Sequence, residues 1–174
     1  INRVNRFGQL LERFGLGQGD VVAMMDWDTH RYLEAFFAVP MLGSTLHTVN
    51  MRLSPSQIAY TIDHAEDDVI LFHSDFIPLL EEVIRDVKRD VRLIIMRDSP
   101  DIELPQTTLK IEAILDELFL DTDQYFSFPE FDENIRATTF YTTGTTGNPK
   151  AVAYSHRQLV LHTMGILATF GPMS

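Results

Sequence analysis

The residues best suited to chemistry lie in one short stretch, residues 142–150. It contains four threonines, two glycines and a lysine: Thr142, Thr143, Gly144, Thr145, Thr146, Gly147 and Lys150. Glycine permits positive φ and lets the backbone approach a ligand closely, and successive backbone N–H groups in such a turn form an anion-binding concavity. Hydroxyls add donors, and a lysine supplies a mobile positive charge suited to phosphate. The stretch favours a phosphate-binding loop over its plainer alternative, a hydroxyl-rich hairpin turn.

The spacing of this loop differs from two familiar nucleotide motifs. A Walker P-loop has two glycines five residues apart, then Lys and Ser or Thr, and leads into a helix. Here Gly144 and Gly147 are three apart, and we expect a strand after Lys150. The dinucleotide fingerprint G-x-G-x-x-G is also absent from this stretch.

The charge distribution is uneven along the 174 residues, whose formal net charge is −11. Residues 98–134 contain eleven acidic residues and one basic residue, whereas residues 135–174 contain three basic residues and no acidic one. A tract without carboxylates suits an anion site, because each nearby carboxylate would repel the ligand. The overall acidity argues against nucleic-acid binding and against adsorption to anionic lipid. The absence of cysteine excludes a disulfide framework, a thiolate zinc site and a cysteine nucleophile.

The elements that must position the loop alternate between strands and helices. The patterning predicts strands at 20–25, 44–49, 69–73, 91–96, 137–142 and 151–154. It predicts helices at 30–42, 54–65, 76–87 and 155–170. Strand–helix–strand units at this spacing indicate an α/β fold with a largely parallel β-sheet flanked by helices.

Three helix ends carry clear signals. Ser54, Pro55 and Gln57 combine a serine cap, a proline at the first helical position and a glutamine three residues after the cap. Gly43 stands where a helix usually ends, and Ser155 caps the last predicted helix.

Residues 98–135 interrupt the alternation with prolines and acidic side chains. We interpret this stretch as an acidic surface excursion within one partial domain spanning 1–174, with one short helix near 109–119. The chain opens on Ile1 and stops after an apolar, helix-like stretch, so we expect it to be a piece of a longer polypeptide. No signal peptide and no membrane-spanning apolar run is visible, and the expected location is cytoplasmic.

Several other residues have a functional and a plainer interpretation. His30, His47, His64, His73 and His162 show no metal-ligand spacing, so we expect structural or exposed roles. We expect His156 to satisfy its neighbours at a helix start rather than to act as a general base.

Acidic and apolar side chains are read in the same way. Phe36, Phe37 and Met41 could form an acyl-chain wall, but helical spacing favours ordinary core packing. The carboxylates Asp26 and Asp28 are expected to cap a helix that starts near Thr29, and residues 66–68 to form a solvated turn.

The string Y-T-T-G-T-T-G-N-P-K-A-V-A-Y-S-H-R at 141–157 resembles the phosphate-binding signature of the adenylate-forming (AMP-binding) superfamily: acyl-CoA synthetases, firefly luciferase and peptide-synthetase adenylation domains. Upstream, H-T-V-N-M-R-L at 47–53 and H-A-E-D-D-V at 64–69 are most similar to the medium- and long-chain fatty-acyl-CoA synthetases. Thr143 stands where the family usually has serine, and Ala151 where glycine is commoner. We expect neither departure to impair phosphate binding.

The resemblance implies a function and a site. It implies that the seven loop residues named above hold the ATP phosphates. It also implies that a fatty acid and ATP form an acyl-adenylate and pyrophosphate, with Mg²⁺ shielding charge. CoA would then form the thioester. The family's catalytic and metal-binding residues would lie beyond Ser174, so we expect no catalytic residue and no metal ligand in this chain, and no adenylation by the chain alone.

Two alternatives stay open. One is a non-catalytic nucleotide- or protein-binding α/β module whose loop is unused. The other is an adenylation domain with a different acyl acceptor, such as a carrier protein, or a luciferase-like oxygenase. The sequence leaves open the acyl-chain length and the oligomeric state, with a homodimer as one option.

Overall fold

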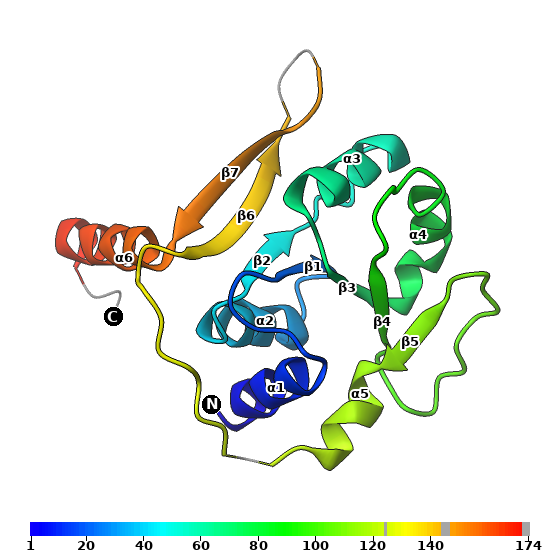
Figure 1. Cartoon of the computed structure of the whole chain (residues 1–174), viewed down its shortest axis with the longest axis horizontal. Coiled ribbons are helices and arrows are strands. Elements are labelled where there is room, and N and C mark those ends of the chain that lie inside the picture. The colour runs from blue at the N-terminus through cyan, green and yellow to red at the C-terminus, as the bar shows by residue number, and fades with distance from the viewer. Residues whose placement is uncertain (124, 144–146, 172–174) are drawn as a thin grey trace.

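The computed structural model describes residues 1–123, 125–143 and 147–171, and its centre is a seven-stranded sheet (Figure 1). The strand order is β5-β4-β3-β1-β2-β6-β7. The strands are β1 (Val21–Met25), β2 (Thr45–Thr48), β3 (Val69–His73), β4 (Arg92–Met96), β5 (Ile111–Ile114), β6 (Arg136–Thr142) and β7 (Lys150–Ser155). Neighbouring strands are parallel except β6 and β7, which are antiparallel. The predicted α/β fold with a largely parallel sheet is therefore confirmed.

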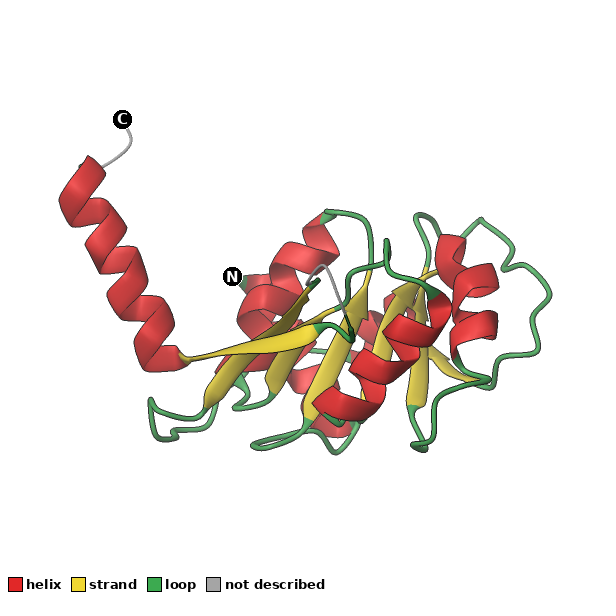
Figure 2. Cartoon of the chain, turned by 90° about the horizontal axis from the view of Figure 1, so that it is seen from above, coloured by secondary structure: helices red, strands yellow, loops and turns green. Residues whose placement is uncertain are grey.

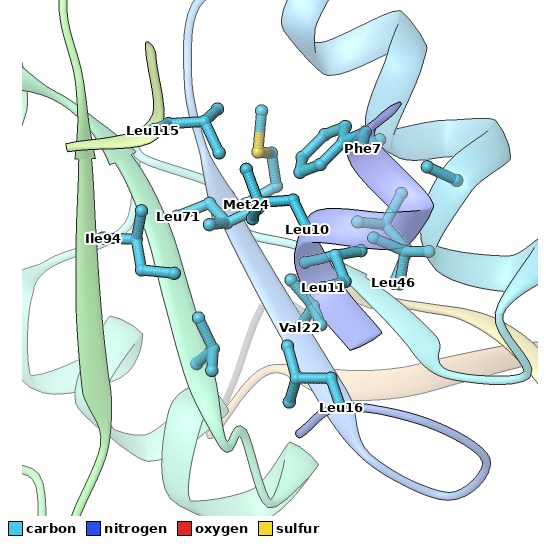
Figure 3. Close-up of a cluster of buried hydrophobic side chains, with 14 of the residues drawn as sticks. Phe7, Leu10, Leu11, Leu16, Val22, Met24, Leu46, Leu71, Ile94 and Leu115 are labelled. Carbon is cyan, nitrogen blue, oxygen red and sulfur yellow. The ribbon is translucent and has the colours of Figure 1, made fainter. Parts of the chain in front are cut away.

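Helices cover both faces of this sheet (Figure 2). They are α1 (Asn2–Arg13), α2 (His30–Met41), α3 (Pro55–Ala65), α4 (Ile77–Val83), α5 (Leu115–Leu118) and α6 (His156–Phe170), with 3-10 turns η1 (Ser74–Phe76) and η2 (Phe119–Asp121). The central strand β1 is buried along its whole length and divides its side chains between two cores. Val22 and Met24 pack with α1 and α2, as Figure 3 shows, whereas Ala23 and Met25 pack with α3 and α4.

The helix ends follow the signals in the sequence. Ser54 and Gln57 form the expected capping box at α3, with Pro55 in the first turn. Ser155 forms a second capping box at α6. Gly43, just after α2, has φ +84°, a conformation that favours glycine. These contacts satisfy backbone groups that a helix end leaves without intrahelical partners.

Two helix assignments need correction. The sequence analysis assigned no element to residues 2–13, where α1 lies with Phe7, Leu10 and Leu11 buried. The helix expected at 76–87 ends at Val83. The backbone N–H of Lys88 donates to Asp63 Oδ1 at 3.0 Å, so the chain after α4 is tied to the end of α3 as a loop.

The stretch 98–135 also differs from expectation. The helix predicted near 109–119 is instead strand β5 followed by the short helix α5. Pairing decides this, because β5 completes hydrogen bonds along the open edge of β4, with Leu93 opposite Ile111. Farther on, Phe126 and Phe128 pack against the α1–α2 core. We call residues 125–135 the return segment, since it leads from α5 back across α1 to β6 (Figure 1).

Helix α6 lies apart from the other helices and extends away from the sheet (Figure 2). None of its described side chains is buried, and most of the apolar ones are exposed. No helix within the described ranges combines the length and apolarity needed to cross a membrane.

Candidate functional site

The candidate loop joins two antiparallel strands at the border of the sheet. β6 ends at Thr142, β7 begins at Lys150, and these two residues are register partners at the mouth of the hairpin. The Thr142 hydroxyl donates to the Lys150 carbonyl over a long 3.5 Å. Strand β7 therefore follows the loop, as predicted, and holds the two ends of the stretch together.

The described loop residues present their groups outward. Thr142, Thr143, Gly147 and Lys150 are exposed, whereas Pro149 between them is buried and anchors the loop. Gly147 has φ +95°, and a Cβ added to it would meet nothing within 4 Å. The requirement for glycine there is conformational, because the surrounding space is open. Three of the predicted site residues, Gly144, Thr145 and Thr146, lie outside the described residues.

The loop stands at the carboxyl-terminal edge of the parallel strands. Strand β6 runs parallel to β2, which is parallel to β1, and β1 to β3. Ligands of open α/β sheets bind outside this edge, where connections turn to opposite faces. Here α2 covers one face after β1 and α3 covers the other face after β2. The hairpin therefore begins at the edge where this fold places ligands.

An open cavity of about 450 Å³ lies at the ends of neighbouring strands. Asp26 and Trp27 line it just after β1, Asn50 and Arg52 after β2, and Phe76 after β3. Trp27 stacks at a tilt on Phe76, with 4.8 Å between ring centroids, and its indole N–H donates to Asp75 Oδ2 at 2.9 Å. This edge thus combines aromatic, cationic and amide groups in a concave surface.

Asp26 lies at this edge but does not face solvent. It is 2% exposed, and it accepts a hydrogen bond from the Thr29 hydroxyl. Thr29 itself caps α2 by accepting from the Arg31 N–H at 3.2 Å. Burial raises the pKa of Asp26 despite the opposing effects of the hydrogen bond from Thr29 and of the nearby His73. Asp26 thus supports the cap through Thr29, whereas Asp28 is exposed.

A buried polar pair was not expected. Asp67, which the sequence analysis placed in a solvated turn, is 0% exposed, and its Oδ2 lies 2.8 Å from Nδ1 of the equally buried His47. The expectation of a solvated Asp67 was therefore wrong. It arose because the acidic neighbours Glu66 and Asp68 are typical of an exposed turn. The adjacency of β2, which carries His47, to the turn before β3 is a tertiary fact with no local signal.

The apolar residues of α2 also need correction. Phe36, Phe37 and Met41 are 44%, 54% and 40% exposed, so ordinary core packing does not describe them within this chain. They line an open apolar groove of about 540 Å³ between α2, the β6–β7 hairpin and α6. His156 lies in the same groove, with its ring centroid 4.8 Å from that of Phe131. Burial lowers the pKa of His156.

The described residues offer no cluster of three or more His, Cys, Asp or Glu side chains arranged to hold a metal ion. We therefore assign no residue of the described ranges to Mg²⁺.

With the loop and the fold described, comparison with known proteins decides the family. A family model described as AMP-binding enzyme matches residues 2–172. The chain belongs to the AMP-binding enzyme family. The predicted resemblance to adenylate-forming enzymes is confirmed by this match.

Two curated relatives carry related names. The chain is 37% identical over 164 residues to the 3-methylmercaptopropionyl-CoA ligase of Ruegeria pomeroyi, covering 94% of the chain and 30% of that protein. It is 41% identical over 162 residues to the long-chain-fatty-acid–CoA ligase of Thermus thermophilus, covering 93% of the chain and 28% of that protein. The chain thus spans about 30% of the length of these relatives.

The fold is shared with a solved ligase. The crystal structure of the anthranilate CoA ligase AuaEII in complex with anthranoyl-AMP matches with a TM-score of 0.80 at 21% identity, over 95% of this chain and 31% of that one.

Proposed function

We propose that this chain is the amino-terminal part of the AMP-binding domain of an ATP-dependent acid–CoA ligase, and that residues 142–150 bind the phosphates of ATP. The observation that carries the proposal is the hairpin loop. It exposes the Thr142 and Thr143 hydroxyls and the Lys150 ammonium at the carboxyl-terminal edge of the sheet. Family membership and the names of the relatives support the same conclusion.

Electrostatics favours an anion at this loop. The 40 residues from 135 to 174 contain no acidic side chain. Lys150 is exposed and forms no ion pair with a described residue, so its charge is available to a ligand. Arg157, another cation of this stretch, forms an ion pair with Glu133 of the return segment, so its charge is offset. Backbone N–H groups and hydroxyls complete a donor set suited to phosphate oxygens.

The proposed chemistry has two steps. A carboxylate oxygen of the acid attacks the α-phosphorus of ATP, the bond to the β-phosphate breaks, and acyl-adenylate and pyrophosphate form. The sulfur of CoA then attacks the acyl carbon and AMP leaves. The loop's contribution is to hold the triphosphate in line and to stabilise charge on the departing pyrophosphate. Mg²⁺ would shield the phosphates further.

The acid we propose is a medium- or long-chain fatty acid. One relative is named for long-chain fatty acids. Another is named for the short sulfur-containing acid 3-methylmercaptopropionate, so the chain length is best determined by a panel of acids. A cytoplasmic location and a homodimer are the accompanying expectations, which cell fractionation and light scattering would test.

Binding of ATP by the complete enzyme tests the proposal. Lys150→Ala and Thr145→Ala remove charge-assisted and hydroxyl donors, and we expect each to weaken ATP binding roughly 10- to 100-fold in calorimetry. The matched control is Lys110→Ala, which removes an exposed lysine outside the loop. Binding that is absent from the parent, or unaffected by the loop variants, would instead support a non-catalytic module.

The inactivity of this chain alone is a separate expectation. ATP–pyrophosphate exchange dependent on a fatty acid, catalysed by the 174 residues by themselves, would contradict it.

A further inference from the structure

The strand that delivers the phosphate loop contacts a polar network in which Tyr141, His47 and Asp67 are buried and His64 is exposed. Tyr141, the residue immediately before Thr142, is buried on β6. Its hydroxyl lies 2.8 Å from Nδ1 of His64 on α3. Its ring centroid is 5.1 Å from that of His47 on β2. Both ends of the Tyr141 side chain are thus fixed by histidines from other elements.

Behind this tyrosine lies the Asp67–His47 pair. Asp67 Oδ2 and His47 Nδ1 are hydrogen-bonded at 2.8 Å, and both side chains are buried. Asp67 Oδ1 and His47 Nε2 find no hydrogen-bond partner among the described residues. Buried polar groups with unmet hydrogen-bonding capacity cost stability. Replacing a buried charged pair with apolar residues of similar volume is often neutral or stabilising, so stability alone does not account for this pair.

The network is connected to the loop by the peptide bond between Tyr141 and Thr142. β2 pairs with β6, with His47 opposite Thr139, so the His47 ring lies beneath the last residues of β6. The His47 ring contacts the Tyr141 ring, and Tyr141 directly precedes Thr142 in the chain, so Tyr141 links the buried pair to the loop.

We infer that the Asp67–His47 pair positions the start of the phosphate loop: through Tyr141 and its partner His64, it fixes the direction in which β6 presents Thr142 and Thr143. This inference rests on the proposed function for its consequence, which is the affinity for ATP phosphates. These four side chains are positioning residues, since none of them is placed against the ligand.

The charges around the network are few and can be named. Asp68 and Arg89 face Asp67, while Tyr60 and Arg136 lie near Tyr141. Burial raises the pKa of Asp67 above its ordinary range, even though His47 opposes the shift. As the pH falls through this raised pKa, Asp67 takes up a proton and the charge that orients the His47 ring is lost.

The test compares Asp67→Asn and Tyr141→Phe with the parent in the complete enzyme. We expect each variant to bind ATP roughly three- to tenfold more weakly at neutral pH, the effect of one hydrogen-bonded contact. Parent affinity should fall relative to Asp67→Asn as the pH is lowered. At each pH the ratio of the parent affinity to that of Asp67→Asn is taken, because the protonation of ATP affects both proteins equally and cancels. Asp67→Asn lacks the carboxyl group whose protonation causes this fall.

Phe140→Leu is the matched control. Phe140 neighbours Tyr141 but lines the groove on the α2 side, away from the network. It should lower the melting temperature without changing ATP affinity more than twofold. Equal losses of affinity in Phe140→Leu, Asp67→Asn and Tyr141→Phe would reduce the network to a stability role and overturn the inference.

A second readout separates this inference from the proposed function. The amide chemical shift of Gly147, measured by NMR without ligand, should move in Asp67→Asn and Tyr141→Phe and stay in place in Phe140→Leu. If the parent binds no ATP, the proposed function fails while the shifts still report on positioning. An unmoved Gly147 amide in Asp67→Asn and Tyr141→Phe would overturn the inference whatever the affinity for ATP.

Discussion

Individual side chains show how closely the return segment is fitted to the rest of the fold. At Gly8 on α1, an added Cβ would collide with the ring of Phe128 and come within 3.0 Å of Phe126. Alanine is otherwise the better helix former, by about 1 kcal/mol. Glycine is therefore retained here against helix propensity, because it lets two aromatic rings approach the helix backbone.

We expect Gly8→Ala to lower the free energy of unfolding by about 1–3 kcal/mol, the range for overpacking a filled site. Urea denaturation monitored by circular dichroism measures this. Gly17→Ala is the control, since Gly17 has nothing within 4 Å and no positive φ. A loss in Gly17→Ala as large as in Gly8→Ala would show that the Phe128 contact is not the cause.

Tyr32 on α2 makes the free energy of unfolding vary with pH in the alkaline range. Burial raises the pKa of its phenol from 10 to about 12. The folded state therefore holds the proton more tightly than the unfolded state. The resulting stability is complete below pH 10 and is lost as the pH rises from 10 to about 12, at up to about 1.4 kcal/mol per pH unit. Tyr32→Phe should flatten this part of the stability profile, and an unchanged slope in that variant would contradict the assignment.

At the scale of elements, local caps define where the helices begin. The Ser54 hydroxyl accepts from the Gln57 N–H, and Gln57 Oε1 accepts from the Ser54 N–H, at 3.3 and 3.2 Å. Helix α3 carries His64 and ends one residue before the turn to Asp67, so its start bears on the network beneath β6.

We expect Ser54→Ala to cost about 1 kcal/mol of stability, because backbone donors in the first turn lose their acceptor. Ser56→Ala is a control in the same helix: the Ser56 hydroxyl accepts from no described backbone N–H, and it contacts the cap only through a 3.2 Å hydrogen bond to the Ser54 hydroxyl. The difference between the two variants in thermal or urea unfolding is the measurement. A cost in Ser56→Ala equal to that in Ser54→Ala would argue against the capping box.

For the whole molecule, the main asymmetry is the contrast between the buried sheet and the exposed helix α6. Val160, Met164 and Leu167 are 53%, 60% and 50% exposed, and α6 extends away from the sheet (Figure 2). Contiguous exposed apolar surface drives association in solution.

The 174-residue chain should therefore self-associate as its concentration rises, which light scattering coupled to gel filtration would measure. Replacing Val160, Met164 and Leu167 with lysine should restore a monomer, because charge on one helix face opposes the contact.

The control for this prediction adds the same charge elsewhere. Lysine at the exposed positions Ser56, Gln106 and Ser127 alters the net charge equally but leaves α6 apolar. If this control abolishes association as effectively, net charge rather than the α6 surface is responsible.

The amino-acid sequence by itself determined the local features and the family. Caps at Ser54 and Ser155, the turn at Gly43 and most strands follow from short-range patterns, because backbone propensity and hydrogen bonding to neighbours are local. The phosphate-loop string is also contiguous, so it could be recognised without a structure. Tertiary structure decided what depends on distant partners. Strand β5 exists because β4 offers an open edge, Asp67 is buried because β2 brings His47 to it, and Gly8 is required because a segment more than 100 residues later packs on it. Such contacts leave no local trace, since the energy that selects them comes from burial and pairing across the fold.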